Sequence, residues 1–297
     1  MMNRRSHTMK RKSTSYKVTF GIAFTLFVLY SLFIIFFFVF AFAIATKTDG
    51  NTFTIDKEYG RIFSFSKPLN FHNFVFAFHI WDDLGLSFSN MIWNSIWRTV
   101  GGVVLGQLSS ALVCYVIIYY KNRLTKFIYN LGLFLTILPL YGGAGAQYKL
   151  YKTLGFINSP TILWPSIALY GGWFFYMCAF WKAISWEYAE AAFVDGANHF
   201  TVFFKIMFPM FLPSMMALVV ISFITGWNGY EQTVLYMKKY PNLAYGIYYY
   251  STVNSYANDG VPAYFAAVLI ALIPSLVLFA AFQNTIMEKV HIGGLKG

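Results

Sequence analysis

Apolar and polar positions along the chain fall into long blocks rather than into a short repeat. Six stretches, each 22 to 29 residues long, contain no charged residue. A helix needs about 20 apolar residues to cross the hydrocarbon core of a bilayer, whereas a membrane β-barrel shows segments of about ten residues with alternating polarity. The pattern therefore predicts an all-α, polytopic membrane protein with six transmembrane helices. These spans are expected at about 18–46, 91–120, 127–148, 158–181, 206–228 and 260–287.

Composition supports a membrane protein over a soluble one. Of the 297 residues, 58% are apolar and only 11% are charged, against about 25% charged in soluble domains. The first apolar stretch is too long for a signal peptide, whose apolar region has about 7–15 residues. Cys114 and Cys178 both fall inside predicted spans, which favours a role as small apolar fillers. His72 and His79 lie seven residues apart without a third ligand, so no metal site is predicted.

Charge predicts the orientation of the chain. The net charge is +11, and six Lys and Arg residues lie within 4–17, directly before the first span, where the positive-inside bias is strongest. With the N-terminus inside, thirteen Lys and Arg residues are cytoplasmic and eight are external, and Arg98 lies at the start of the second span. Both termini are therefore expected in the cytoplasm. Residues 1–17 form a basic tail that contacts lipid headgroups, 18–287 form the transmembrane domain, and 288–297 form a C-terminal tail.

The inner loop 182–205 holds the most informative polar residues. Three of the four carboxylates expected on the cytoplasmic side gather there: Glu187, Glu190 and Asp195. Ser185 is a suitable N-cap and Gly196 can supply the positive φ that ends a helix. We expect a short helix, a turn at Gly196, and a second helical stretch from Asn198 toward Pro209. Composition alone favours an ordinary capped connecting loop.

Spacing within this loop changes that interpretation. Glu-Ala-Ala at 190–192, then Gly196 after three residues, Ile206 after nine more, and Phe208-Pro209 after one more resemble the EAA motif of binding-protein-dependent ABC importer permeases. Phe208 replaces the usual Leu, and both are apolar. The resemblance implies that the loop is a coupling helix that docks in a cleft of a cytoplasmic ATPase subunit. The implied coupling residues are Glu187, Glu190, Ala191, Ala192, Asp195, Gly196, Ala197, Ile206 and Pro209.

Four shorter motifs extend the resemblance over most of the chain. Their order and placement are similar to those of the carbohydrate subclass, the group that contains the maltose-type G subunit. The motifs are Asn94-Ser95, the sequence at 154–158, Trp227-Asn228 and the terminal glycine-rich sequence at 293–297. The resemblance implies a type I ABC importer permease fold over 18–287, in the bacterial cytoplasmic membrane. The implied function is that of a permease subunit of an ATP-driven importer for carbohydrates, in particular oligosaccharides, forming half of the translocation pathway.

The implied partners complete such an importer. They are a second, homologous permease subunit in a heterodimer, two ATPase subunits, and an extracytoplasmic sugar-binding protein or lipoprotein. The chain lacks the G-x-x-x-x-G-K-[ST] sequence that cradles nucleotide phosphates, so ATP and Mg²⁺ are expected on the ATPase subunits. No catalytic constellation is visible, and the chain is not expected to be an enzyme or to hold a cofactor.

Other functions stay open at this point. The EAA loop does not specify the substrate, so a permease for a peptide or another polar solute is an alternative. A secondary transporter would be expected to show internal repeats around buried ionisable sites, and neither pattern is visible in the sequence. A membrane enzyme would need ionisable residues beside its substrate.

A sugar path is predicted near the outer end of the fifth span. Aromatic faces and amide groups suit the CH faces and hydroxyls of carbohydrates. The candidates are Trp227, Asn228, Tyr230, Glu231, Tyr248 and Tyr249. For any single tyrosine, anchoring at the interface or contact with the binding protein is the competing interpretation. Residues 240–258 are expected to form an outer loop, and Arg98 is expected to extend toward the membrane surface.

Overall fold

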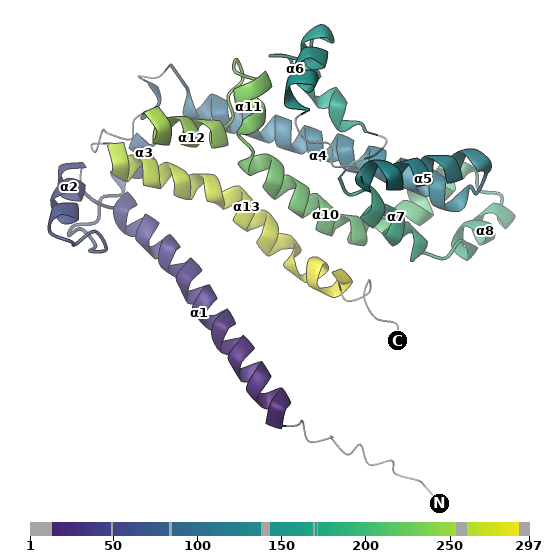
Figure 1. Ribbon diagram of the computed structural model, residues 1–297, viewed down its shortest axis with the longest axis horizontal. Helices are drawn as coiled ribbons and strands as arrows, with labels where there is room; N and C mark the ends of the chain where they lie inside the picture. Colours follow the sequence, from purple (N-terminus) through teal and green to yellow (C-terminus); the bar gives the residue numbers. More distant parts are fainter. Residues whose placement is uncertain are drawn as a thin grey trace, which may run out of the picture. The chain divides into compact units, whose positions relative to one another are not determined.

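The computed structural model describes residues 14–48, 50–82, 85–137, 143–168, 170, 172–253 and 260–290, and within these ranges it contains helices and no strand (Figure 1). The predicted all-α fold is therefore confirmed. Most of the predicted basic tail and the glycine-rich C-terminal sequence lie outside the described residues. The helices are α1 (Thr14–Ala45), α2 (Gly50–Glu58), α3 (His72–Phe76), α4 (Phe88–Tyr119), α5 (Arg123–Ile137), α6 (Ala144–Thr153), the 3₁₀-helix η2 (Pro160–Ser166), α7 (Phe174–Lys182), α8 (Glu187–Val194), α9 (His199–Thr201), the π-helix η3 (Val202–Met207), α10 (Phe208–Asn228), α11 (Glu231–Tyr236), α12 (Leu243–Val253) and α13 (Val261–Val290).

Within the described ranges, four helical segments are long and apolar enough to cross a membrane. They are Tyr16–Ala45, Phe88–Tyr119, His199–Asn228 and Val261–Asn284. These segments overlap the first, second, fifth and sixth predicted spans. Most large apolar side chains of α1 are exposed along its length, and a helix that is apolar on every side belongs in lipid or in a protein core.

The third and fourth predicted spans are not continuous helices. In the range 127–148, α5 ends at Ile137 and α6 begins at Ala144, with 138–142 outside the described residues. In the range 158–181, η2 is followed by non-helical residues before α7. Pro160 and Pro165 lack the N–H that an α-helix needs, which explains the short 3₁₀ turn. Because 138–142, 169 and 171 lie outside the described residues, the count of six crossings stays a prediction.

The described residues fall into two compact units. The smaller unit takes in the described parts of 1–74 and 258–266, and the larger unit takes in the rest, so the division falls within α13. In the larger unit α4 is central, because it packs against α5, α7, α10, α12 and η2. Figure 1 shows α8 and α12 at opposite ends of this unit. The segment 240–258, expected to be a loop, contains α12, whose 11 residues are too few to cross a bilayer.

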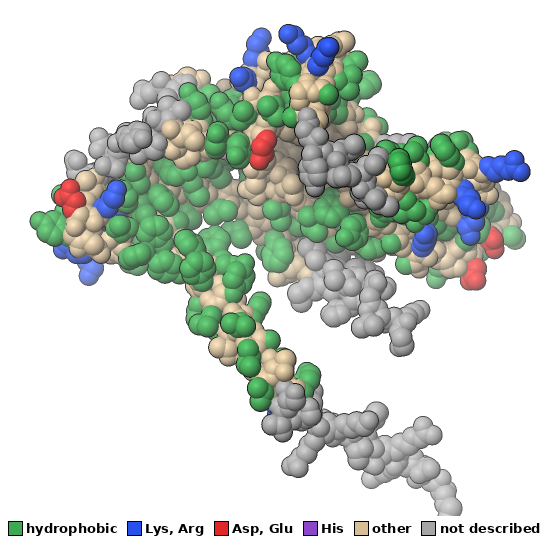
Figure 2. Space-filling view, viewed as in Figure 1, with side chains coloured by type: hydrophobic (Ala, Val, Ile, Leu, Met, Phe, Trp, Pro, Cys, Tyr) green, Lys and Arg blue, Asp and Glu red, His purple; other side chains and the backbone are tan. Residues whose placement is uncertain are grey.

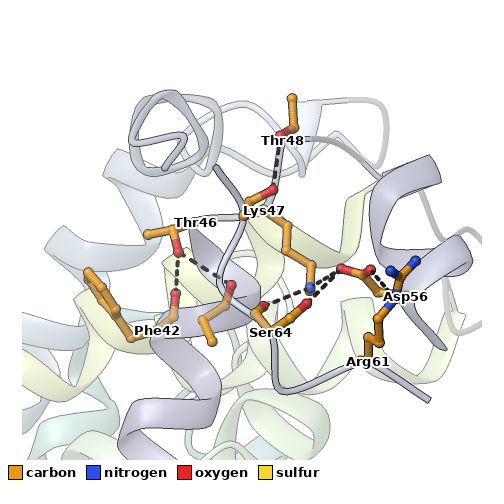
Figure 3. A network of polar contacts seen from close by, with 9 residues as sticks. Phe42, Thr46, Lys47, Thr48, Asp56, Arg61 and Ser64 are labelled. Atoms are coloured by element: carbon orange, nitrogen blue, oxygen red, sulfur yellow. Dashed lines mark hydrogen bonds and ion pairs between the residues drawn. The ribbon is translucent and has the colours of Figure 1, made fainter. Parts of the chain in front are cut away.

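In the smaller unit, a buried lysine fixes the chain that follows α1. The side chain of Lys47 is fully buried, and its Nζ donates hydrogen bonds to the Asp56 carboxylate and, over 3.1 Å, to the Ser64 carbonyl (Figure 3). Asn73 holds the backbone nearby, since its Nδ2 donates to the carbonyls of Ala45 and Lys47 at 2.8 and 2.7 Å. The hydrogen bond from Lys47 lowers the pKa of Asp56 below its ordinary value.

We expect Asp56→Asn to loosen this segment, because it leaves the Lys47 ammonium buried without a counter-charge. Breaking a buried ion pair costs roughly 3–5 kcal/mol. The pKa of Asp56 is lower in the folded state, so its contribution to stability is present at neutral pH and is lost as the pH falls through the folded pKa. Limited proteolysis of the segment 47–67 should therefore be faster in Asp56→Asn at pH 7, with the two proteins converging in acid. The control is Glu58→Gln, which changes an exposed carboxylate on the same helix and should be cleaved at the same rate as the wild type. Equal rates of cleavage for all three proteins would contradict the role of Asp56.

Candidate coupling surface and transport cavity

The inner loop contains the predicted short helix, α8, with a defined start and end. The Oγ of Ser185 accepts a hydrogen bond of 3.3 Å from the Glu187 N–H. At the other end Gly196 has a φ of +83°, its N–H donates to the Phe193 carbonyl, and the Ala197 N–H donates to the Ala192 carbonyl. This pair of bonds is a Schellman motif, in which glycine relieves the strain of the left-handed residue. The turn after α8 therefore depends on the conformation of Gly196.

The second helical stretch also begins as predicted. The Oδ1 of Asn198 caps it by accepting a bond of 2.8 Å from the Thr201 N–H. It then passes through η3, where the Phe208 N–H donates to the Phe203 carbonyl five residues earlier, and continues as α10. Pro209 has no N–H for the Lys205 carbonyl, and the wider π turn accommodates this loss. The loop and the fifth predicted span are thus joined by one continuous helical segment.

The predicted coupling residues divide between an outer and an inner face of the loop. Glu187, Glu190, Ala191, Asp195, Gly196 and Pro209 are exposed, Ala197 and Ile206 are half-buried, and Ala192 is buried. The small size of Ala192 therefore serves the packing of α8 against its own chain. Two apolar side chains that the sequence did not single out dominate the outer face, since Val194 is 87% exposed and Phe200 is 77% exposed. Exposed apolar groups with an acidic rim are typical of an interaction site.

An aromatic cluster attaches this loop to the rest of the larger unit. It consists of Tyr115, Tyr119, Trp181, Trp186, Phe203 and Phe211. Tyr119 stacks on Trp186 with ring centres 4.8 Å apart, and Trp181 stacks on Phe211 at 4.0 Å. The hydroxyl of Tyr119 bonds the carbonyl of Trp181 over 2.7 Å. The rings come from α4, α7, η3 and α10 and from the residue before α8, so the cluster packs the start of α8 against several helices.

A polar cavity of about 580 Å³ lies between α4, α6, η2, α10 and α11. Its polar lining comes from amides, hydroxyls and two charged side chains. These are Arg98, Thr99, Gln107, Ser110, Gln147, Tyr151, Ser166, Ser222, Thr225, Glu231, Gln232, Tyr236 and Asn242. The Nε2 of Gln107 donates to the Ser222 Oγ over 2.6 Å, whereas its buried Oε1 has no partner within the described part of the chain. Gln107 therefore contributes a buried acceptor that the described chain leaves unsatisfied beside the cavity.

Only one of the predicted path residues, Glu231, is among the residues that line this cavity. The indole of Trp227 is buried, and its Nε1 donates a bond of 2.9 Å to the Ala271 carbonyl of α13. The amide of Asn228 donates to the Ile224 carbonyl of its own helix. Both side chains are therefore engaged in packing or in closing the end of α10.

The predicted tyrosines stack in pairs. Tyr230 and Tyr248 lie with ring centres 4.2 Å apart and nearly parallel, and Tyr249 stacks on Tyr245 at 5.7 Å. Tyr248 remains exposed. The pairs form an aromatic surface on α12 and the residue before α11, separate from the residues that line the cavity.

Arg98 is held by partners at one end of the larger unit. Its Nη1 donates to the Thr233 Oγ1 over 2.8 Å and to the Tyr240 carbonyl over 3.4 Å, and the side chain lines the cavity. Its extension toward the membrane surface stays a prediction. The contact between Arg98 and Thr233 could not be predicted from the sequence, because the two residues lie far apart in the chain.

Two of the short sequence motifs hold this outer segment in place. The Nδ2 of Asn94 donates to the Pro241 carbonyl, and the Oγ of Ser95 accepts a bond of 2.8 Å from the Leu243 N–H. Asn158 adopts a φ of +53°, and its Oδ1 accepts a bond of 2.9 Å from the Lys239 N–H. The two motifs thus hold α11 and α12 at the end of the larger unit that contains the polar cavity.

Comparison with known proteins gives a uniform result. No protein-family model matches the chain. Arabinooligosaccharides transport system permease protein AraQ from Halalkalibacterium halodurans is 26% identical over 77% of this chain and 80% of its own length. Melibiose/raffinose/stachyose import permease protein MelC from Bacillus subtilis is 26% identical over 81% and 86%, and diacetylchitobiose uptake system permease protein NgcG from Streptomyces coelicolor is 28% identical over 80% and 79%.

A solved structure has the same fold. It is one chain of the crystal structure of a bacterial ABC transporter involved in the import of the acidic polysaccharide alginate. The match has a TM-score of 0.74 and 19% identity, and it covers 93% of this chain and 99% of that one. This chain is a membrane protein that is homologous to carbohydrate ABC transporter permeases and has the fold of an ABC importer chain.

Proposed function

We propose that the chain is a permease subunit of an ATP-driven importer of carbohydrates, in particular oligosaccharides. It would cross the bacterial cytoplasmic membrane six times with both termini inside and form half of the translocation pathway. The observation that carries the proposal is the geometry of α8, a short helix with a fixed end at Gly196 and an exposed face that includes Val194. The homology to sugar permeases supports it.

In this proposal the exposed face of α8 docks in a cleft of an ATPase subunit. The acidic rim formed by Glu187, Glu190 and Asp195 surrounds the apolar contact, while the buried Ala189 and Ala192 keep α8 close to its own chain. The aromatic cluster converts movement of α8 into movement of α4, α7 and α10. ATP and Mg²⁺ bind to the ATPase subunits, and this chain contributes no catalytic group or cofactor site.

The polar cavity is proposed as the sugar path on this side of the importer. Its volume falls within the range of small-molecule sites, and its lining combines neutral amides and hydroxyls with the rings of Tyr151 and Trp173. Such groups bind sugar hydroxyls and CH faces. A peptide or another polar solute is the alternative cargo, and the sugar names of the relatives favour carbohydrate over it.

The remaining partners follow from this role. A second, homologous permease subunit forms the other half of the pathway as a heterodimer, and an extracytoplasmic binding protein or lipoprotein delivers sugar to the outer mouth. The experiment is reconstitution of the complex in liposomes with its ATPase subunits and binding protein. We expect ATP-dependent uptake of labelled oligosaccharides and none of labelled peptides; uptake without ATP would contradict the proposal.

We expect Gln107→Leu to weaken sugar transport, because it replaces an amide side chain in the lining of the cavity by an apolar one. Losing one or two hydrogen bonds of this kind costs about 1–3 kcal/mol, so the sugar concentration for half-maximal uptake should rise about tenfold. Ser109→Ala is the matched control, because the Ser109 Oγ bonds the Gly106 carbonyl of its own helix. An unchanged half-maximal concentration in Gln107→Leu would exclude this wall of the cavity from the sugar path.

A further inference from the structure

A second hollow lies at the opposite end of α4 from the polar cavity. This inner basic groove has a volume of about 920 Å³ and is formed by the end of α4, the loop 120–122, the start of α5, and the end of α7 with the loop that follows it. Four cations line it: Lys121, Arg123, Lys126 and Lys182. No carboxylate is found among its described lining residues, and none of the four cations forms an ion pair within the described chain. Figure 2 shows Lys and Arg side chains on the surface in the region of α5, with Asp and Glu side chains beside them toward α8.

The backbone at the start of α5 holds these charges in place. The Oδ1 of Asn122 accepts a bond of 2.8 Å from the Thr125 N–H, and the Thr125 Oγ1 accepts a bond of 3.0 Å from the Asn122 N–H. This reciprocal cap fixes the first turn of α5. The positive end of the α5 dipole therefore adds to the field of Arg123 and Lys126.

The other walls of the groove are apolar and aromatic. Ile117, Ile118, Tyr119 and Trp186 line one side. Across the groove, the Lys182 Nζ lies 4.9 Å from the centre of the Tyr129 ring and 3.3 Å from its hydroxyl. Cations beside apolar and aromatic side chains match a molecule with an anionic head and hydrocarbon chains.

We propose that the inner basic groove binds the phosphate headgroup of an anionic phospholipid of the cytoplasmic leaflet. Its placement in that leaflet rests on the topology of the proposed function, which puts the end of α4 and the start of α5 inside. Basic pockets between membrane helices on the cytoplasmic side are suited to such headgroups. The four cations hold the phosphate, and Ile117 and Ile118 contact the acyl chains.

Lipid in this groove would also act on the coupling loop. Tyr119 and Trp186 line the groove and belong to the aromatic cluster, and Trp186 directly precedes α8. A headgroup held against Trp186 restrains the start of α8. Anionic lipid is therefore expected to set the efficiency with which ATP hydrolysis drives transport.

The test is lipid binding to the purified chain in detergent, measured by native mass spectrometry with phosphatidylglycerol, cardiolipin or phosphatidylcholine. We expect the two anionic lipids to bind more tightly than phosphatidylcholine. Their affinity should fall about fivefold for each cation removed. In the double variant Lys121→Ala/Lys126→Ala it should therefore fall roughly 25-fold. Lys182→Gln is a second variant with a single substitution, and its affinity for the anionic lipids should fall about fivefold. The matched control is Lys149→Ala/Lys152→Ala, which removes two exposed lysines of α6 and should bind as the wild type does.

Three results would overturn the proposal. One is equal affinity of the wild type for phosphatidylcholine and phosphatidylglycerol. Another is a loss of lipid affinity in Lys149→Ala/Lys152→Ala that equals the loss in Lys121→Ala/Lys126→Ala. The third is full displacement of the lipid by inorganic phosphate at millimolar concentration, which would make the groove a site for soluble phosphate. Because the assay contains neither ATP nor sugar, its failure would leave the proposed transport function standing, and loss of transport would not change its result.

Discussion

Gly196→Val is expected to leave the transporter assembled but to abolish sugar-stimulated ATP hydrolysis. Gly196 has a φ of +83°, a conformation that a β-branched residue rarely adopts and that costs about 1–2 kcal/mol for ordinary L-residues. A Cβ at this position would meet nothing within 4 Å, so the effect comes from the backbone rather than from a clash. Valine shifts the turn and changes the angle between α8 and the following helix, and the stimulated rate should fall at least tenfold to the basal rate.

Two substitutions separate the turn from general damage. Gly196→Asn keeps most of the activity in this account, because asparagine tolerates the left-handed region. Gly60→Val introduces the same residue at a φ of +66° with equally open space, far along the chain from α8, and should leave coupling intact. Stimulated hydrolysis and uptake are measured on the reconstituted complex. Normal uptake with Gly196→Val would remove Gly196 from the mechanism.

The second large effect is expected for Trp181→Ala. Trp181 is fully buried, stacks on Phe211 at 4.0 Å, and donates its indole N–H to the Ala111 carbonyl over 3.0 Å. Truncation leaves a void between α4, α7 and α10, and large-to-small changes of this type cost about 3–5 kcal/mol. The thermal unfolding temperature of the purified protein should fall by roughly 10 °C, and coupling should fall with it because the aromatic cluster is broken.

Control variants again isolate the cause. Trp181→Phe keeps a ring against Phe211 but loses the hydrogen bond to the Ala111 carbonyl and part of the buried ring volume, so its unfolding temperature should lie between those of Trp181→Ala and the wild type. Trp164→Ala removes a tryptophan that is 67% exposed and should shift the unfolding temperature little. A Trp181→Ala protein as stable as Trp164→Ala would contradict the assigned role of the cluster.

Local features of the chain were predictable because local physics determines them. Uninterrupted apolar runs predicted the four long helices, and Gly196 predicted the end of α8. The predicted N-cap was one residue early, because α8 is preceded by Trp186, and Ser185 accepts a bond from the Glu187 N–H instead. The coupling role inferred from the motif spacing around Gly196 stays a prediction. The non-helical residues of the fourth range were not predicted, although Pro160 and Pro165 were a visible signal, because the absence of charge does not reveal residues that interrupt a helix.

The cavity and the aromatic cluster depend on contacts between distant residues, which no local pattern specifies. Arg98 meets Thr233 across 135 positions, and Gln107 meets Ser222 across 115. A single sequence contains many tyrosines and tryptophans, and nothing in it shows that Tyr119 stacks on Trp186. For the same reason Trp227 was predicted to lie in the sugar path, while the structure uses its indole to hold α13.

The most direct test of the account is site-specific photo-crosslinking from position 194 in the intact membrane. Val194 is 87% exposed at the end of α8, so a photoreactive residue there should capture the partner that docks on the coupling surface. The account predicts a crosslink from position 194 to a subunit that carries a nucleotide-binding P-loop. A photoreactive residue in place of Leu154, which is exposed and expected on the outer side, should give no such crosslink. Capture of that ATPase subunit from position 154, or its absence from position 194 in a transport-competent complex, would contradict it.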